Sequence, residues 1–315
     1  MADVVFVRGV EATNVRWWHT ENSWSSNSYL TKEGGALYLV DSGLGSVHRN
    51  RLAEAVARYP KVEKAYLLNT HWHLDHSGNG TILDELKRVA YQVRYPVPEI
   101  AREDMINLKE RPNVSVEVEM AISDADWLKE ADKEEFDFGS IAIRGWRIGE
   151  VYLLSTRGHS PDSACMYLRG QKALFPGDLL WYVNPNTLEG SIDSLLQSIS
   201  QIKLLVAEEG IDYLGQAHFL PIEGRDKIIG LISEYEEKEK ALVSSLEDQV
   251  AGRKRVSLDE CLEHLRQSNH PAIKEAIRIN YPYFPSYLHR FIYVFLRERE
   301  WHKVETGTWS RRGPS

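Results

Sequence analysis

The chain has 315 residues, a hydrophobic fraction of 43% and a formal net charge of −8. Its length allows one large domain with an appendage, and its apolar fraction excludes wholesale disorder. The acidic balance argues against a nucleic-acid partner, which needs basic phosphate contacts, and the longest apolar run, Phe291 to Leu296, is too short for a membrane span. Two cysteines and an N-terminus without a cationic leader or an apolar signal core favour a cytoplasmic protein.

The N-terminal half alternates short β-prone runs with turn signals. An amphipathic helix is predicted from His48 to Tyr59, and helical spacing returns from Ile192 to Ile202. The strands are predicted at residues 4–7, 28–31, 36–40, 65–68, 141–148, 151–155, 164–168 and 172–175. This alternation indicates an α/β body in which strands lead directly into turns that carry polar residues.

The negative charge is concentrated in one segment. Residues 99–137 contain 13 acidic and 5 basic side chains, a net of −8, so the remainder of the chain is neutral in sum. With prolines at 96, 98 and 112 and no sustained strand pattern, residues 96–137 are interpreted as an inserted helical or loop excursion. A solvated charged face and a lid over a site are the two alternatives.

The character of the chain changes after Pro221. Apolar residues at helical spacing from Ile228 to Val250 predict a long helix, and Ser257 to Glu260 fit a capping box that opens a shorter one. Pro271 begins another helix, and residues 286–300 predict the last. We therefore expect a main domain over 1–223, an all-helical extension over 224–302 and a flexible tail over 303–315.

The segment His71-Trp72-His73-Leu74-Asp75-His76 concentrates metal-ligating side chains at the end of a predicted strand. In extended backbone His71 and His73 project to the same side, while Asp75 and His76 can face a second point. Such a group is costly unless positive charge lies between its members, and imidazole and carboxylate are the usual ligands of zinc, iron or manganese. A pair of metals needs further ligands from elsewhere in the chain.

Three further candidates each follow a predicted strand: His159, Asp178 and His218. Together with the His71–His76 segment, this order resembles the metallo-β-lactamase superfamily, whose HxHxDH signature matches here, and the Val40-Asp41-Ser42-Gly43 strand end fits as well. The resemblance covers residues 5 to 220. It implies a four-layer αβ/βα sandwich with the metal site along one edge of its two sheets.

The same resemblance implies a role for each ligand. It assigns His71, His73 and His159 to one divalent ion, most often Zn²⁺ with iron or manganese as alternatives. Asp75, His76 and His218 go to a second ion, and Asp178 bridges the two. Two cations sharing a hydroxide would bring the pKa of bound water toward neutrality, Asp75 could take up a proton, and Asp41 would orient the histidine loop from behind the ligands.

Aromatic residues offer candidates for the substrate pocket. Trp18 and His19 lie in a polar, turn-rich stretch, and Trp181 and Tyr182 follow Asp178 closely. The C-terminal extension is also rich in aromatics, whose spacing fits a core, a homodimer interface or a cap over the site. A cap would favour a hydrophobic or aromatic small-molecule substrate.

The ligand set predicts a metal-dependent hydrolase that cleaves an ester, thioester, lactone or amide bond through attack by a metal-bound hydroxide. Aspartate at 178 resembles the thioesterase, lactonase and phosphodiesterase branches, whereas Trp181 and Asp162 depart from the lactonase and glyoxalase patterns. An iron-dependent dioxygenase similar to persulfide dioxygenases and a non-catalytic ligand-binding protein are the alternatives.

Overall fold

The computed structural model describes residues 4–7, 25–108, 115–181, 187, 189–283 and 285–311. The chain divides into two compact units. The first comprises residues 1–155, 162–178 and 204–228, and the second comprises residues 156–161, 179–203 and 229–315. Two segments, residues 156–161 and 179–203, thus belong to the second unit. The predicted boundary between residues 223 and 224 places both of them in the first domain.

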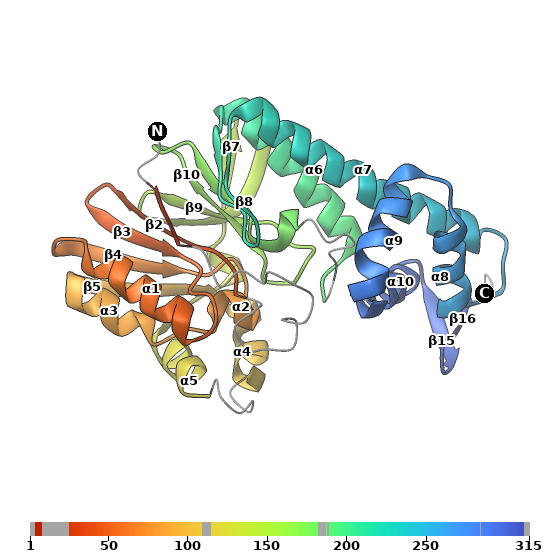
Figure 1. Ribbon diagram of the computed structural model, residues 1–315, viewed down its shortest axis with the longest axis horizontal. Helices are drawn as coiled ribbons and strands as arrows, with labels where there is room; N and C mark the ends of the chain where they lie inside the picture. Colours follow the sequence, from red (N-terminus) through yellow and green to blue (C-terminus); the bar gives the residue numbers. More distant parts are fainter. Residues whose placement is uncertain are drawn as a thin grey trace. The chain divides into compact units, whose positions relative to one another are not determined.

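The first unit contains a six-stranded sheet in the order β1-β2-β3-β4-β5-β6. β1 to β3 are antiparallel, and β3 to β6 are parallel. Helices α1 (Ser46–Ala57) and α3 (Ile82–Val89) cover one face through a continuous apolar core (Figure 1). The strands are Val4–Val7, Ser28–Glu33, Ala36–Val40, Val62–Leu68, Ala90–Pro98 and Ala125–Leu128. Both faces of β3 are buried, which explains its unbroken apolar run.

A seven-stranded sheet in the order β13-β12-β11-β10-β9-β8-β7 packs against the other face of the first sheet. Their shared core includes Tyr38 stacked on Tyr66 at 5.1 Å, together with Trp146 and Met166. The strands are Glu134–Phe138, Ile141–Ile148, Val151–Ser155, Ala164–Leu168, Ala173–Phe175, Tyr213–Leu214 and Ile222–Glu223.

The C-terminal end of helix α6 (Ile192–Glu209) contacts the second sheet. Glu209 accepts hydrogen bonds from Tyr167 Oη at 2.9 Å and Arg169 Nε at 2.7 Å. With helices on the outer face of each sheet, the predicted four-layer αβ/βα sandwich is confirmed.

The acidic segment is helical where the structure describes it between residues 99 and 124, as predicted, but residues 125–128 and 134–138 are built into the sheets, where the predicted excursion is wrong. After η2 (Glu99–Ala101), α4 (Arg102–Leu108) and α5 (Ser115–Asp124), Ala125–Leu128 forms β6, parallel to β5. After η3 (Glu130–Asp132), Glu134–Phe138 forms β7, the edge strand of the second sheet. Charged residues on short edge strands suppress edge-to-edge pairing, and their high charge hides the strand signal in the sequence.

The second unit contains the predicted C-terminal helices. They are α7 (Arg225–Val250, of which residues 229–250 belong to this unit), α8 (Leu258–Gln267), α9 (Pro271–Tyr283) and α10 (Pro285–Glu298). Ser257 and Glu260 form the predicted capping box at the start of α8. In the ranges that the structure describes, none of the helices combines the length and apolar composition that a bilayer crossing requires.

The flexible tail predicted over residues 303–315 is wrong for residues 303–311. Strands β15 (Trp301–Glu305) and β16 (Thr308–Arg311) form an antiparallel pair, and β14 (Arg255–Ser257) pairs with β16, so a small sheet accompanies the helices (Figure 1). Trp301 and Trp309 are buried in the helical core beside Phe295. Gly307, at φ 77°, makes the turn. The tryptophans hold this segment in place through contacts that are distant in sequence.

We predict that Trp309→Ala lowers the free energy of unfolding by about 3–5 kcal/mol, because it leaves a cavity in the core of the second unit. Urea unfolding monitored by circular dichroism measures the change. Val304→Ala, a truncation on the neighbouring strand at a side chain 52% exposed, is the control and should cost much less. Equal stability of Trp309→Ala and the wild type would show that the tail contributes no packing.

A buried histidine links α1 to the start of β2. His48 is fully buried in α1, with Nε2 2.7 Å from Ser28 Oγ and Nδ1 2.9 Å from Ser25 Oγ. The sequence indicated no role for His48 beyond a position in a helix or on the surface. Burial, assisted by Arg51, lowers the pKa of His48 to about 4. The folded protein therefore holds this imidazole neutral.

Since the unfolded chain takes up this proton near pH 6.5 and the folded chain only near pH 4, stability is lost as the pH falls through that window. We predict that between pH 7.5 and pH 5 the wild type loses about 2 kcal/mol more stability than His48→Gln. Urea denaturation at both pH values measures the difference, in which groups common to both proteins cancel. Parallel pH profiles for the two proteins would contradict a neutral, buried His48.

Candidate metal centre

The predicted ligands all lie where strands end. Asp41 follows β3, and the His71–His76 segment follows β4 and runs into the single turn α2 (Leu74–Ser77). His159 follows β9, Asp178 lies in η4 (Gly177–Leu180) after β11, and His218 follows β12. Apart from Asp41, the structure groups these side chains into two clusters of potential metal ligands.

One cluster consists of Asp75, His76, Asp178 and His218, each offering a ligand atom within 4.8 Å of the others. Asp178 Oδ1 lies 3.2 Å from both His76 Nε2 and His218 Nε2. Asp75 Oδ2 lies 3.4 Å from His218 Nε2 and 3.7 Å from His76 Nε2. Donor atoms around a tetrahedral ion with bonds of about 2.0–2.1 Å stand about 3.3 Å apart. The spacing and the two-nitrogen, two-oxygen donor set both fit zinc, iron or manganese.

The electrostatics of this cluster also favour a cation. Burial opposes ionisation of Asp178, but His218 and His76 outweigh it and hold the pKa of its carboxyl well below the usual value. Burial likewise opposes protonation of His76, yet Asp178, Asp41 and Asp75 raise the pKa of that imidazole well above 6.5. The buried Asp178 carboxylate therefore requires positive charge beside it, which protons on the histidines supply in the metal-free chain and a metal ion could replace.

The other cluster consists of His71, His73 and His159, whose ligand nitrogens lie within 4.8 Å of one another. His71 Nε2 stands 2.9 Å from His73 Nδ1. His71 and His159 are buried, and His73 is partly exposed. Three neutral imidazoles can hold a zinc ion and leave a fourth position open for water or substrate.

Asp41 and Thr70 orient the histidine loop. Asp41 accepts hydrogen bonds from His76 Nδ1 at 2.9 Å, from the Thr70 backbone N–H at 2.7 Å and from Thr70 Oγ1 at 3.1 Å. Because a carboxylate only accepts, His76 Nδ1 carries the proton, and Nε2 faces Asp75 and Asp178. His76 Nε2 is buried and lies 3.2 Å from Asp178 Oδ1, as expected for a nitrogen that shares a metal ion with this carboxylate.

Gly177 allows the Asp178 turn to approach this loop. Its φ is 55°, and a Cβ at this position would lie 2.6 Å from the Thr70 side chain. A residue larger than glycine would push Asp178 away from the histidine loop.

The structure describes some of the other candidate residues and not others. Asp178 is grouped with Asp75, His76 and His218, and its bridging to the three-histidine cluster stays a prediction. Trp181 is buried and packs edge to face on Tyr287 of α10 at 5.5 Å, and its pocket role also stays a prediction. Trp18, His19 and Tyr182 lie outside the described residues.

Several residues that support the loop were given no role in the site by the sequence analysis. The backbone N–H groups of Ser42 and Gly43 both donate to the carbonyl of His76, and Ser42 Oγ donates to the same oxygen at 3.1 Å. Ser42 and Gly43 directly follow Asp41, so their position beside a candidate residue was the available signal. Thr70 precedes His71 and offered the same signal.

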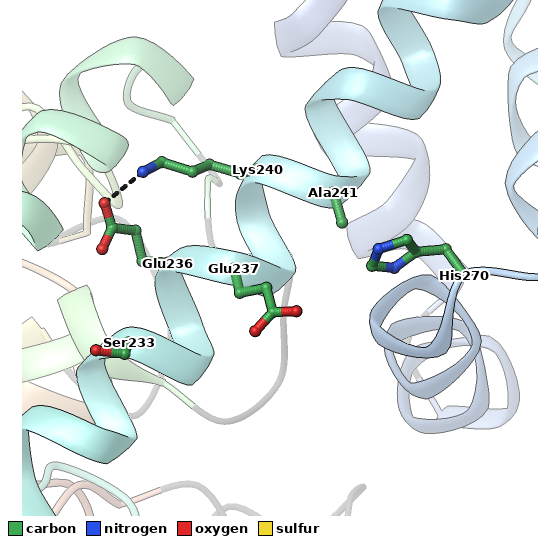
Figure 2. A pocket seen from close by; sticks show the side chains of 6 residues that line it. All are labelled: Ser233, Glu236, Glu237, Lys240, Ala241 and His270. Carbon is green, nitrogen blue, oxygen red and sulfur yellow. Dashed lines mark hydrogen bonds and ion pairs between the residues drawn. The ribbon is translucent and has the colours of Figure 1, made fainter.

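A separate surface hollow of about 400 Å³ lies along α7, lined by Ser233, Glu236, Glu237, Lys240, Ala241 and His270 (Figure 2). Glu236 pairs with Lys240, as Figure 2 shows, and also with Lys203. The hollow shares no residue with either ligand cluster, and its paired charges give it no evident ligand.

The sandwich carries, at its strand ends, two clusters of side chains that could hold metal ions. The family model for the metallo-beta-lactamase superfamily matches residues 22–213, and the chain belongs to this superfamily. The predicted family and the assignment as an enzyme, a metallohydrolase, are thus confirmed.

Curated relatives and solved structures agree with the family. An atrochrysone carboxyl ACP thioesterase of Aspergillus fumigatus is 27% identical over 180 residues, which cover 57% of this chain and 47% of that protein. A beta-lactamase-like protein 2 homolog of Caenorhabditis elegans is 24% identical, covering 71% of this chain and 66% of that protein. The chain thus spans less than half of the thioesterase and about two thirds of the nematode protein.

Two solved structures share the fold over almost the whole chain. A metallo-beta-lactamase family protein of Thermus thermophilus has a TM-score of 0.56 at 19% identity, covering 99% of both chains. A beta-lactamase domain protein of Burkholderia ambifaria has a TM-score of 0.61 at 13% identity, covering 99% of this chain and 93% of that one.

We predict that Asp41→Asn weakens zinc binding by about 10–100-fold, because the amide removes the charge that fixes the His76 tautomer and ring orientation. Competition with a chromogenic chelator measures the affinity. Asp126→Asn is the control, since Asp126 pairs with Arg94 at 2.9 Å on the protein surface. Zinc affinity equal to that of the wild type in Asp41→Asn would contradict the orienting role.

Proposed function

We propose that the protein hydrolyses an acyl bond of a small, apolar organic substrate, with thioesters as the first substrate class to test. The observation that carries this proposal is the set of buried and partly buried imidazoles and carboxylates, with Asp178 among its ligands. A carboxylate there supplies a hard oxygen donor suited to cations that activate water.

Two observations support an apolar acyl substrate. A relative at 27% identity is named a carboxyl ACP thioesterase, and an acyl thioester is the substrate that its name indicates. Phe219 and Leu220 directly follow His218 and are 37% and 57% exposed. Apolar side chains exposed beside a ligand-bearing loop favour contact with an apolar group of the substrate.

We further propose that His71, His73 and His159 hold one divalent ion and that Asp75, His76 and His218 hold a second, with Asp178 shared and zinc the first metal to test. Such ions supply water of lowered pKa and polarise the carbonyl of the substrate. Asp75, 23% exposed, is the most accessible carboxylate of its cluster and the candidate to take up a proton during acyl transfer. Asp41 keeps His76 in the tautomer that binding requires.

We predict that zinc-reconstituted protein cleaves acyl thioesters and that Asp178→Ala and His71→Ala lower kcat/KM by on the order of 1,000-fold, or about 4 kcal/mol of transition-state stabilisation. The measurement is a substrate screen across thioesters, aryl esters, lactones, amides and phosphodiesters, with metal content determined for each variant. Asp226→Ala, which removes a carboxylate 96% exposed at the start of α7, is the matched control.

An active, metal-free Asp178→Ala variant would contradict the proposed mechanism. If protein purified without added metal contains mainly iron, consumes oxygen and shows no hydrolysis, the protein is a dioxygenase and the proposed hydrolysis is wrong.

A further inference from the structure

The Ser25–Ser28 segment, which leads into β2, contacts two of the three loops that carry ligands of the four-residue cluster. Its contacts reach Asp75 on the loop after β4 and the residues around His218 on the loop after β12. These two ligands are far apart in sequence, and the loops that bear them come from different sheets. A common support is therefore a means of fixing their separation.

Asn27 holds the His218 loop at three carbonyls. Its backbone N–H donates to Ala217 O, and its side-chain Nδ2 donates to Gln216 O at 3.0 Å and Phe219 O at 2.7 Å. These carbonyls belong to residues on either side of His218. The amide is 4% exposed, and its two hydrogens match the two side-chain contacts. Asn27 thus fixes the backbone of this ligand without contacting its ring.

Tyr29 and Gln216 extend this attachment. Tyr29 Oη donates to Gln216 O at 2.6 Å, and Gln216 Nε2 donates to Leu220 O at 2.7 Å. The backbone from Gln216 to Leu220 is therefore held by the beginning of β2 and by its own side chain.

Ser26 makes the contact to the other ligand. Its backbone N–H donates to Asp75 O at 2.9 Å. The hydroxyls of Ser25 and Ser28, on either side of Ser26 and Asn27, form hydrogen bonds with the two ring nitrogens of His48. Ser25 Oγ also accepts a hydrogen bond from Leu44 N–H at 2.9 Å. The segment is fastened to α1 and to the loop after Asp41, so its two ligand contacts start from a fixed base.

We propose that Asn27 is a positioning residue that sets His218 relative to Asp75, and through them the affinity of the four-residue cluster for its metal ion. This role rests on the proposed function, which places an ion in that cluster. The proposal predicts an effect on the ion at the four-residue cluster and none on the ion at the three histidines. Within the described residues, the hydrogen bonds of Asn27 go to the His218 loop and none goes to His71 or His73. Polar groups that orient metal ligands from behind are typically worth 10–100-fold in affinity.

The test is a zinc titration of metal-free wild type, Asn27→Ala, Tyr29→Phe and Tyr38→Phe by isothermal calorimetry. We expect the wild type to bind two zinc ions. In Asn27→Ala the affinity for the second ion, at the four-residue cluster, should be about 10–100-fold lower, while the affinity for the first ion, at the three histidines, should not change. Cobalt in place of zinc adds a spectroscopic readout, since altered d–d absorption of the second ion reports a changed ligand arrangement. Tyr38→Phe is the control, because it removes a partly buried hydrogen bond, donated by Glu150 N–H to Tyr38 Oη, that involves neither ligand loop.

Unchanged affinity of Asn27→Ala for both ions would overturn the positioning role. The role would also be overturned if Asn27→Ala and Tyr38→Phe lowered the affinity for both ions to the same extent. If Asn27→Ala does not fold, Tyr29→Phe decides: it removes one bond to Gln216 O and should weaken the second ion where Tyr38→Phe does not. Equal affinities in those two variants would contradict the proposal. A wild type that binds no zinc would instead contradict the proposed function, which keeps the two failures distinguishable.

Discussion

The site depends on one electrostatic constraint: an oxygen of each of two carboxylates is held 3.2–3.7 Å from a nitrogen of each of two imidazoles, at the ends of strands. Buried charges of this kind are tolerated only when positive charge compensates them. The surrounding structure maintains the arrangement. Asp41 fixes the ring of His76, Gly177 lets Asp178 approach, and Asn27 holds the backbone around His218. The two sheets supply rigid ends from which these short loops project.

Much of the fold and the grouping of the site could be predicted from the sequence, because both depend on local patterns in a fixed order. The strands Ile141–Ile148, Val151–Ser155 and Ala164–Leu168 have the predicted limits, since the first alternates exposed and buried side chains, the other two are largely apolar, and all three end at clear turns. The His71–His76 segment is compact, so its ligands could be recognised together. His159, Asp178 and His218 could be linked to it only through their order along the chain, which the family resemblance interpreted.

Most features that the sequence did not predict depend on contacts distant along the chain. The edge strand β7 is an exception, because its partner β8 follows directly in a hairpin and its acidic residues alone conceal it, whereas β6 pairs with the earlier strand β5. Trp309 orders the last strand by entering a core built from α7 to α10. The role of Asn27 is visible only when its partners, 189 and 192 residues away, are brought beside it. A polar residue before a strand otherwise resembles any turn residue.

The most direct test of the central claim, that the Asp75, His76, Asp178 and His218 cluster is a metal site, is anomalous diffraction from crystals of the zinc-loaded protein. Data collected on both sides of the zinc absorption edge locate the ions independently of activity. The account predicts an anomalous peak within bonding distance, about 2.0–2.2 Å, of the four donor atoms, and a second at His71, His73 and His159. Ordered density for these side chains with no peak among Asp75, His76, Asp178 and His218 would contradict it.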